Sequence, residues 1–255
     1  MDSTSTRLKR ASLISIIAMC GMLLLYALTS AGYMGDNPVG RGGTYEAPLI
    51  VPAGYAFSIW SIIYLGLIVF PVYQLVKRKE GHLDWKKIHG LYAINVICNG
   101  LWLAAASYDW LWISVGIIVV MLITLYKINQ LLNQRRAAGD IKNYWIEHFP
   151  MSVYFAWITL ATALNVSSAL DFYNWSGLEI SPTSWTLAIM SVAAVIAFLV
   201  YRRFGEAAYP GVVVWAFIAL YIKHQGLIPS IAMLSIIIAI IFVILTIGGI
   251  RRQVS

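Results

Sequence analysis

Asparagine and tryptophan side chains recur at helical spacing inside the apolar runs of this sequence. Asn95, Asn99 and Trp102 follow one another at intervals of four and three residues, which places them on one face of a helix. An amide in hydrocarbon is costly unless it is hydrogen-bonded, and an indole offers a flat apolar surface with one donor. These residue types could bind a flat apolar ligand, or could join neighbouring helices.

A second helical face carries Trp157, Ala161 and Asn165, each four residues after the last. A third apolar run opens with Tyr55 and Trp60. Counted at about 1.5 Å of rise per residue, four side chains fall in the middle or outer half of a membrane and could converge: Trp60, Asn99, Trp102 and Asn165. Aromatic walls with a few placed polar groups are typical of pockets for small apolar ligands.

A structural role is the alternative for these side chains. Asparagines in membrane helices often bond a neighbouring helix, which contributes roughly 0.5–2 kcal/mol. Tryptophans near helix ends often anchor a protein at the membrane interface, and Trp110, Trp112, Trp175 and Trp185 fit that role. Tryptophans that lie inside their runs, away from the ends, favour a pocket.

Charged and nucleophilic groups do not form a catalytic pattern. No Asp, Glu, Lys or Arg lies near the middle of an apolar run, which counts against a cation-coupled transporter. The histidines fall in loops or at a helix entrance, where we expect them to be solvated or interfacial and not catalytic: His82, His89, His148 and His224. We therefore predict no catalytic residue, no metal site and no required cofactor.

The elements that position these residues are long apolar segments. The chain has 255 residues, of which 60% are hydrophobic and 11% charged, against about 25% charged in soluble domains. Runs near the ~20 residues that cross a bilayer predict an all-α polytopic membrane protein. The predicted spans are 11–31, 55–76, 88–107, 110–131, 149–170, 184–201, 207–223 and 229–250. The span at 207–223 is short and contains Pro210, so a count of seven stays open.

Basic residues alternate between the loops. Sixteen of the eighteen Lys and Arg residues lie in segments that eight spans place on one side of the membrane. The positive-inside rule puts both termini in the cytoplasm. The net charge of +7 follows from this topology, so nucleic acid is not an expected partner. Compact loops without an organelle-type leader favour a bacterial plasma membrane.

Three motifs carry a resemblance to a known family. Residues 51–64 read VPAGYAFSIWSIIY, Asn99 and Trp102 form an NxxW pattern, and residues 157–165 read WITLATALN. In this order the motifs resemble the translocator-protein family, the tryptophan-rich sensory proteins (TspO/MBR). The likeness covers roughly residues 11–175 and implies a five-helix bundle, with residues 176–255 as an extension of three further helices.

The resemblance implies a ligand cavity that opens toward the loop between the first two helices. Family members bind porphyrins and haem, and some degrade porphyrin in a light- or oxygen-dependent way. The implied function is a membrane sensor or binding protein for a tetrapyrrole or similar flat ligand. A transporter, a porphyrin-degrading enzyme, a scaffold with a closed pocket and a homodimer stay open. The expected ligand-binding residues are Tyr55, Trp60, Asn99, Trp102, Trp157, Ala161 and Asn165.

Overall fold

The computed structural model describes residues 3–35, 48–77, 83–175 and 179–254. Within these ranges all regular structure is helical. The helices are α1 (Ser3–Ser30), the 3-10 helix η1 (Gly54–Ser58), α2 (Ile59–Lys77), α3 (Leu83–Ser107), α4 (Leu111–Ala137), α5 (Tyr144–Glu147), α6 (Phe149–Phe172), α7 (Pro182–Phe204), α8 (Ala208–His224) and α9 (Pro229–Val254).

The prediction of an all-α polytopic membrane protein is confirmed. In the described part of the chain, seven helices are long and apolar enough to cross a membrane, and α8 is a shorter apolar helix. Its 17 residues extend about 26 Å at 1.5 Å per residue. Pro210 lies in the first turn of α8, where its missing N–H has no intrahelical partner to lose.

The chain packs into two compact units, which we describe separately. Unit 1 comprises Met1–Thr44 and Ser61–Met151, and unit 2 comprises Tyr45–Trp60 and Ser152–Ser255. Unit 2 therefore combines η1 and most of α6 with the three C-terminal helices. The domain boundary predicted after residue 175 stays a prediction.

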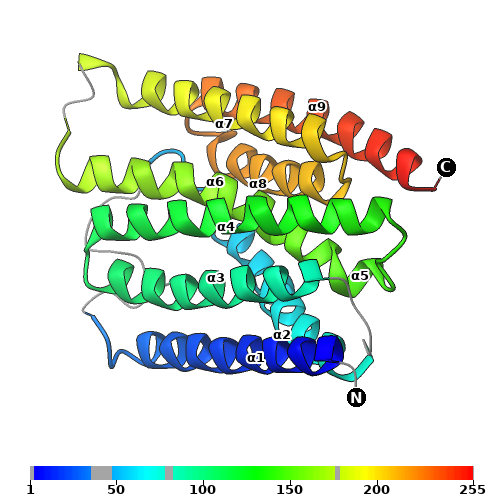
Figure 1. Cartoon of the computed structure of the whole chain (residues 1–255). Coiled ribbons are helices and arrows are strands. Elements are labelled where there is room, and N and C mark those ends of the chain that lie inside the picture. The colour runs from blue at the N-terminus through cyan, green and yellow to red at the C-terminus, as the bar shows by residue number, and fades with distance from the viewer. Residues whose placement is uncertain (1–2, 36–47, 78–82, 176–178, 255) are drawn as a thin grey trace. The chain divides into compact units, whose positions relative to one another are not determined.

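Helix α3 is central to unit 1, because it packs against both α1 and α4 (Figure 1). Gly100 of α3 lets α1 approach closely, since an added Cβ would lie 2.7 Å from Leu25 Cδ1. Asn95 ties α3 to α4 by donating to the carbonyl of Met121 at 3.0 Å and to Thr124 Oγ1 at 2.7 Å. For Asn95 the structure favours the role of a link between helices.

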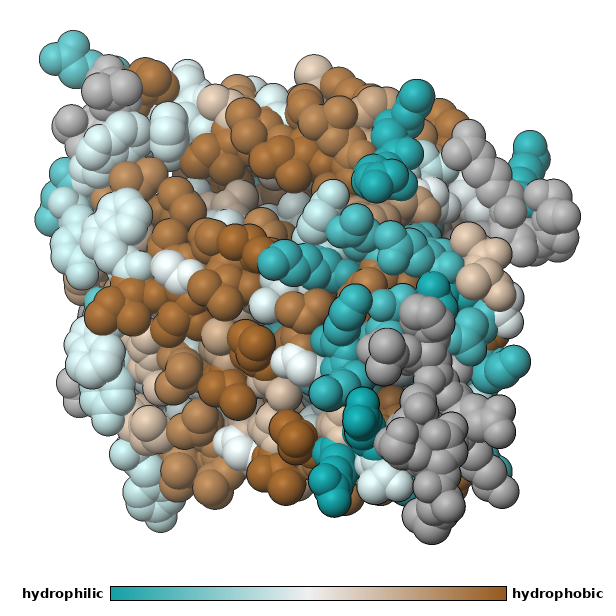
Figure 2. Space-filling model, in the orientation of Figure 1, coloured by the Kyte–Doolittle hydropathy of each residue, from teal (hydrophilic) through white to brown (hydrophobic). Residues whose placement is uncertain are grey.

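Polar groups gather at one end of unit 1. Figure 2 shows hydrophilic side chains where α4 ends and α3 begins, beside the apolar surface of the same two helices. Arg135 forms an ion pair with Asp84 at 3.3 Å, and Trp85 Nε1 donates to Asp140 Oδ2 at 2.8 Å. Lys87 and Arg135 thus lie at this end of unit 1, and the gathering of the basic segments on one side of a membrane stays a prediction.

In unit 2, α8 packs along α9, and α7 contacts both (Figure 1). Local signals delimit α7. Ser181 accepts the N–H of Ser184 at 3.2 Å, and Pro182 occupies the first helical position. Gly205 ends the helix at φ 69°, a left-handed conformation that glycine adopts without steric cost.

The histidine prediction is wrong for three of the four residues. His89, His148 and His224 are buried, and His82 lies outside the described residues. For His89 and His224, neighbouring segments supply hydrogen-bond partners within the protein. His89 lies within 3.2 Å of Ser12 Oγ and 2.8 Å of Ser15 Oγ, both on α1.

Glycine at position 66 sets the contact between α2 and the start of α6. A Cβ there would lie 2.3 Å from Pro150 Cβ and 2.9 Å from its Cγ. We expect Gly66→Ala to lower the free energy of unfolding by about 1–3 kcal/mol through overpacking. Thermal unfolding in detergent measures the effect. Gly116→Ala is the matched control, because its Cβ meets nothing within 4 Å; equal midpoints for the two variants would contradict the close contact.

Candidate ligand-binding site

Helix α6 presents a cluster of aromatic side chains in unit 2. The ring centroid of Trp157, a residue only 2% exposed, lies 5.8 Å from that of Phe57 and 6.4 Å from that of Trp60. Trp60 also meets Tyr154 at 6.0 Å. All three pairs are edge-to-face, an arrangement that contributes about 0.5–1.5 kcal/mol beyond burial. The cluster holds Trp157 in a fixed orientation.

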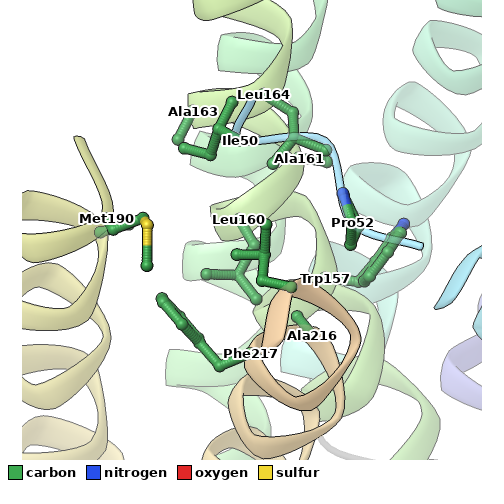
Figure 3. Close-up of a pocket in the computed structure, with 12 residues that line it drawn as sticks. Ile50, Pro52, Trp157, Leu160, Ala161, Ala163, Leu164, Met190, Ala216 and Phe217 are labelled. Carbon is green, nitrogen blue, oxygen red and sulfur yellow. The ribbon is translucent and has the colours of Figure 1, made fainter. Parts of the chain in front are cut away.

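Trp157 also forms part of the wall of an apolar cavity of about 30 Å³. Figure 3 shows the lining residues of α6 on one side, with Met190 of α7 and Phe217 of α8 opposite, and Pro52 beside the indole. The lining exposes no polar surface to the cavity. The residues that line it are Ile50, Pro52, Trp157, Leu160, Ala161, Ala163, Leu164, Met190, Ala193, Ala216, Phe217 and Leu220.

The indole nitrogen of Trp157 is buried, and no described residue accepts its hydrogen. In Figure 3 the nitrogen lies on the side of Pro52, turned away from Met190 and Phe217. A buried Trp N–H usually finds a hydrogen-bond partner. An acceptor atom of a ligand bound beside Trp157 would satisfy this donor.

A segment preceding α2 covers the cavity and is held by α8. Lys223 Nζ donates to the carbonyl of Val51 at 2.7 Å, and His224 Nε2 lies 2.8 Å from the carbonyl of Leu49. Trp215 Nε1 donates to the carbonyl of Ala56 at 3.0 Å. Through these contacts the C-terminal part of the chain positions one wall of the cavity.

A second, larger cavity of about 220 Å³ lies next along α6, and Ile50 lines both. Trp175 and Trp185 form part of its wall, with ring centroids 4.7 Å apart. Asp171 brings a carboxylate to this cavity. The two cavities together offer apolar surface at one end and the carboxylate of Asp171 at the other.

A comparison with protein families identifies the family of this chain. The family described as TSPO-like protein matches residues 12–248. The chain belongs to the TSPO-like protein family. The match continues through α7 and α8 and into α9, so these helices lie within the family region. Searches of curated proteins and of solved structures found no significant match.

Five of the expected ligand-binding residues lie in unit 2, and all five belong to the TSPO-like motifs. Trp157 and Ala161 line the first cavity, and Trp60 belongs to the aromatic cluster. Tyr55 is 41% exposed and packs edge-to-face on Trp215 at 5.2 Å. Asn165 is partly exposed and is not among the residues that line the two cavities.

The other two expected residues belong to unit 1. Asn99 is fully buried, and its Oδ1 accepts a hydrogen bond from Tyr64 at 3.4 Å, which links α3 to α2. Trp102 is half-buried on α3. Convergence of these two with the residues of unit 2 stays a prediction.

Sequence reasoning missed the contributions of α7 and α8. Met190, Ala193, Ala216, Phe217 and Leu220 line the cavity, yet none belongs to a TSPO-like motif. Their apolar types are those of any membrane helix, so no pattern singles them out. Among the described residues, no group of three His, Cys, Asp or Glu side chains is placed to hold a metal ion.

Proposed function

We propose that this TSPO-like protein is a membrane binding protein for a flat apolar ligand of the tetrapyrrole class. The observation that carries the proposal is the position of Trp157, a rigidly packed indole in the wall of an all-apolar cavity. Concave apolar sites with few polar groups are the usual form of small-molecule pockets. The family match supports the membrane and TSPO-like character of the chain.

The chemistry of the wall favours a planar ligand without charge at its centre. The ring of Trp157 can stack on a conjugated plane, and Ala161 leaves the backbone of α6 open to close approach. Met190 supplies a polarizable thioether opposite the indole (Figure 3), and such side chains adapt to aromatic surfaces. The N–H of Trp157, for which no described residue is an acceptor, can donate to an acceptor atom of the ligand.

The size of the cavity requires movement on binding. About 30 Å³ is far below the ~300–1,000 Å³ of typical ligand sites. Ile50 lines both cavities, so displacing its side chain would join them. A macrocycle would then extend from Trp157 toward the second cavity, with its carboxylates directed away from Asp171 because like charges repel.

We also propose that both termini face the cytoplasm of a bacterial plasma membrane. The basic segments at the N-terminus, at the start of α3 and at the end of α4 support this orientation, since cytoplasmic loops carry an excess of Lys and Arg.

Absorbance titration with protoporphyrin IX, on purified protein in detergent, tests the proposal. Trp157→Phe keeps an aromatic ring and removes the donor, so we expect roughly three- to tenfold weaker binding, the equivalent of one hydrogen bond. Trp112→Phe is the matched control, because Trp112 is 49% exposed on α4. Linear uptake that is equal in all proteins would mean partition into detergent and would refute a specific site.

Two further measurements separate binding from the alternatives. Accumulation of protoporphyrin IX inside sealed vesicles would indicate transport. Loss of porphyrin absorbance that depends on light or oxygen, and that Trp157→Phe abolishes, would indicate degradation. Saturable binding with neither effect supports a sensor or carrier.

A further inference from the structure

A groove runs between α3 and α4 on the surface of unit 1, and it shares no lining residue with the two cavities of unit 2. Its volume is about 590 Å³. Each helix contributes one lysine, and the floor between the two lysines is apolar. The residues that line it are Lys87, Gly90, Leu91 and Ile94 of α3, and Lys127, Gln130, Leu131 and Gln134 of α4.

The two lysines lie at similar levels along α3 and α4. Lys87 lies 20 residues from the end of α3 at Ser107, about 30 Å along the helix, which is the thickness of the hydrocarbon core. Lys127 lies 16 residues from the start of α4 at Leu111, about 24 Å along. Its long side chain can extend its ammonium group to the headgroup layer. Both charges therefore meet the lipid phosphates at the end of unit 1 where polar groups gather.

The lysines are available to an external anion. Lys127 is exposed, and no carboxylate of a described residue forms an ion pair with it. Lys87 lies 3.3 Å from Asp84, but its side chain is 67% exposed, and such surface pairs are worth under about 1 kcal/mol. Asp84 also pairs with Arg135 at 3.3 Å, so its charge is shared.

The floor of the groove has the shape and polarity for a lipid. Gly90 has no side chain, and an added Cβ there would meet nothing within 4 Å, so the space above it is open. Leu91, Ile94 and Leu131 extend the apolar surface from this point. Gln130 and Gln134 supply amide donors beside the lysines. A free phosphate would leave the apolar floor uncovered, whereas the first carbons of an acyl chain would cover it.

We propose that this groove binds one anionic phospholipid, with the phosphate between Lys87 and Lys127 and the start of an acyl chain over Gly90. Basic pockets between membrane helices are known to take anionic headgroups, and the attraction is about 1 kcal/mol per basic residue near the surface. The inference is independent of the ligand proposed for the cavities of unit 2.

Native mass spectrometry of the full chain in detergent, titrated with phosphatidylglycerol, tests the site. We expect one tightly retained phosphatidylglycerol and little retention of phosphatidylcholine. Lys87→Gln with Lys127→Gln should weaken retention about tenfold or more. Lys86→Gln with Lys142→Gln is the matched control, because both residues are exposed at the same end and neither lines the groove. This control should stay within about twofold of the wild type.

Gly90→Leu tests the apolar half of the site without a change of charge. An added Cβ there meets nothing within 4 Å and Gly90 is exposed, so we expect the variant to fold while lipid retention falls, and thermal unfolding in detergent checks that it is folded. Equal losses in the two double variants would indicate diffuse attraction and overturn the site. Displacement of the lipid by inorganic phosphate at equal concentration would also overturn it, because the acyl contacts would then add nothing.

Discussion

Replacing Glu147 by alanine is expected to lower the free energy of unfolding by about 3 kcal/mol, with a matching fall in the thermal midpoint in detergent. The carboxylate is fully buried. It accepts the backbone N–H groups of Lys142 at 2.6 Å and Asn143 at 3.0 Å, and the side-chain amide of Gln74 at 2.8 Å. Alanine leaves these donors without an acceptor, and each buried unsatisfied group costs about 1–3 kcal/mol.

The variant Glu147→Gln shows whether stability depends on the hydrogen bonds of this side chain or on its negative charge. The amide oxygen of glutamine can accept the two backbone donors, and its NH₂ group can donate to Gln74 Oε1, which has no partner among the described residues. This requires only that the Gln74 amide rotates, so we expect less than half of the loss caused by alanine. Equal losses would show that the negative charge itself is required.

Placing a large side chain at position 161 is expected to weaken porphyrin binding at least tenfold. Ala161 lines the cavity beside Trp157, and a phenylalanine ring exceeds the roughly 30 Å³ that is open there. The ring would occupy the surface on which the ligand lies. Absorbance titration with protoporphyrin IX measures the change, and elution from a sizing column shows whether the variant is folded.

Ala188→Phe is the control for this substitution. Ala188 is exposed on α7 and does not line the cavity, so the same added ring should leave the affinity unchanged. If Ala161→Phe binds porphyrin as the wild type does, the ligand lies elsewhere. The cavity would then be a closed remnant, which is the scaffold alternative.

The apolar runs predicted the helices closely, because a backbone in hydrocarbon must satisfy its own polar groups and a helix does so within one segment. Each predicted span overlaps an observed helix, and the span at 55–76 covers both η1 and α2. The ends of the helices were predicted less closely than their positions. Helix α4, for example, continues to Ala137, beyond the predicted limit at 131. Polar residues that extend a helix past the membrane carry no hydropathy signal.

The motifs around residues 51–64, 99–102 and 157–165 identified the family, and two of their residues, Trp157 and Ala161, line a cavity. Motifs report which residue types recur at a spacing, and this information is local. It did not distinguish a helix link from a ligand contact. Asn99 bonds Tyr64, so a polar contact within unit 1 already satisfies part of its amide.

The sequence alone thus determined the class of the protein, the positions of its helices and its TSPO-like character. Tertiary structure decided which faces meet. It brought Met190 and Phe217 opposite Trp157 and buried His224 against the carbonyl of Leu49. It also buried Glu147, whose carboxylate accepts a hydrogen bond from Gln74. These outcomes depend on contacts between residues distant in the chain. In helices that are apolar on every side, hydropathy leaves such contacts undetermined.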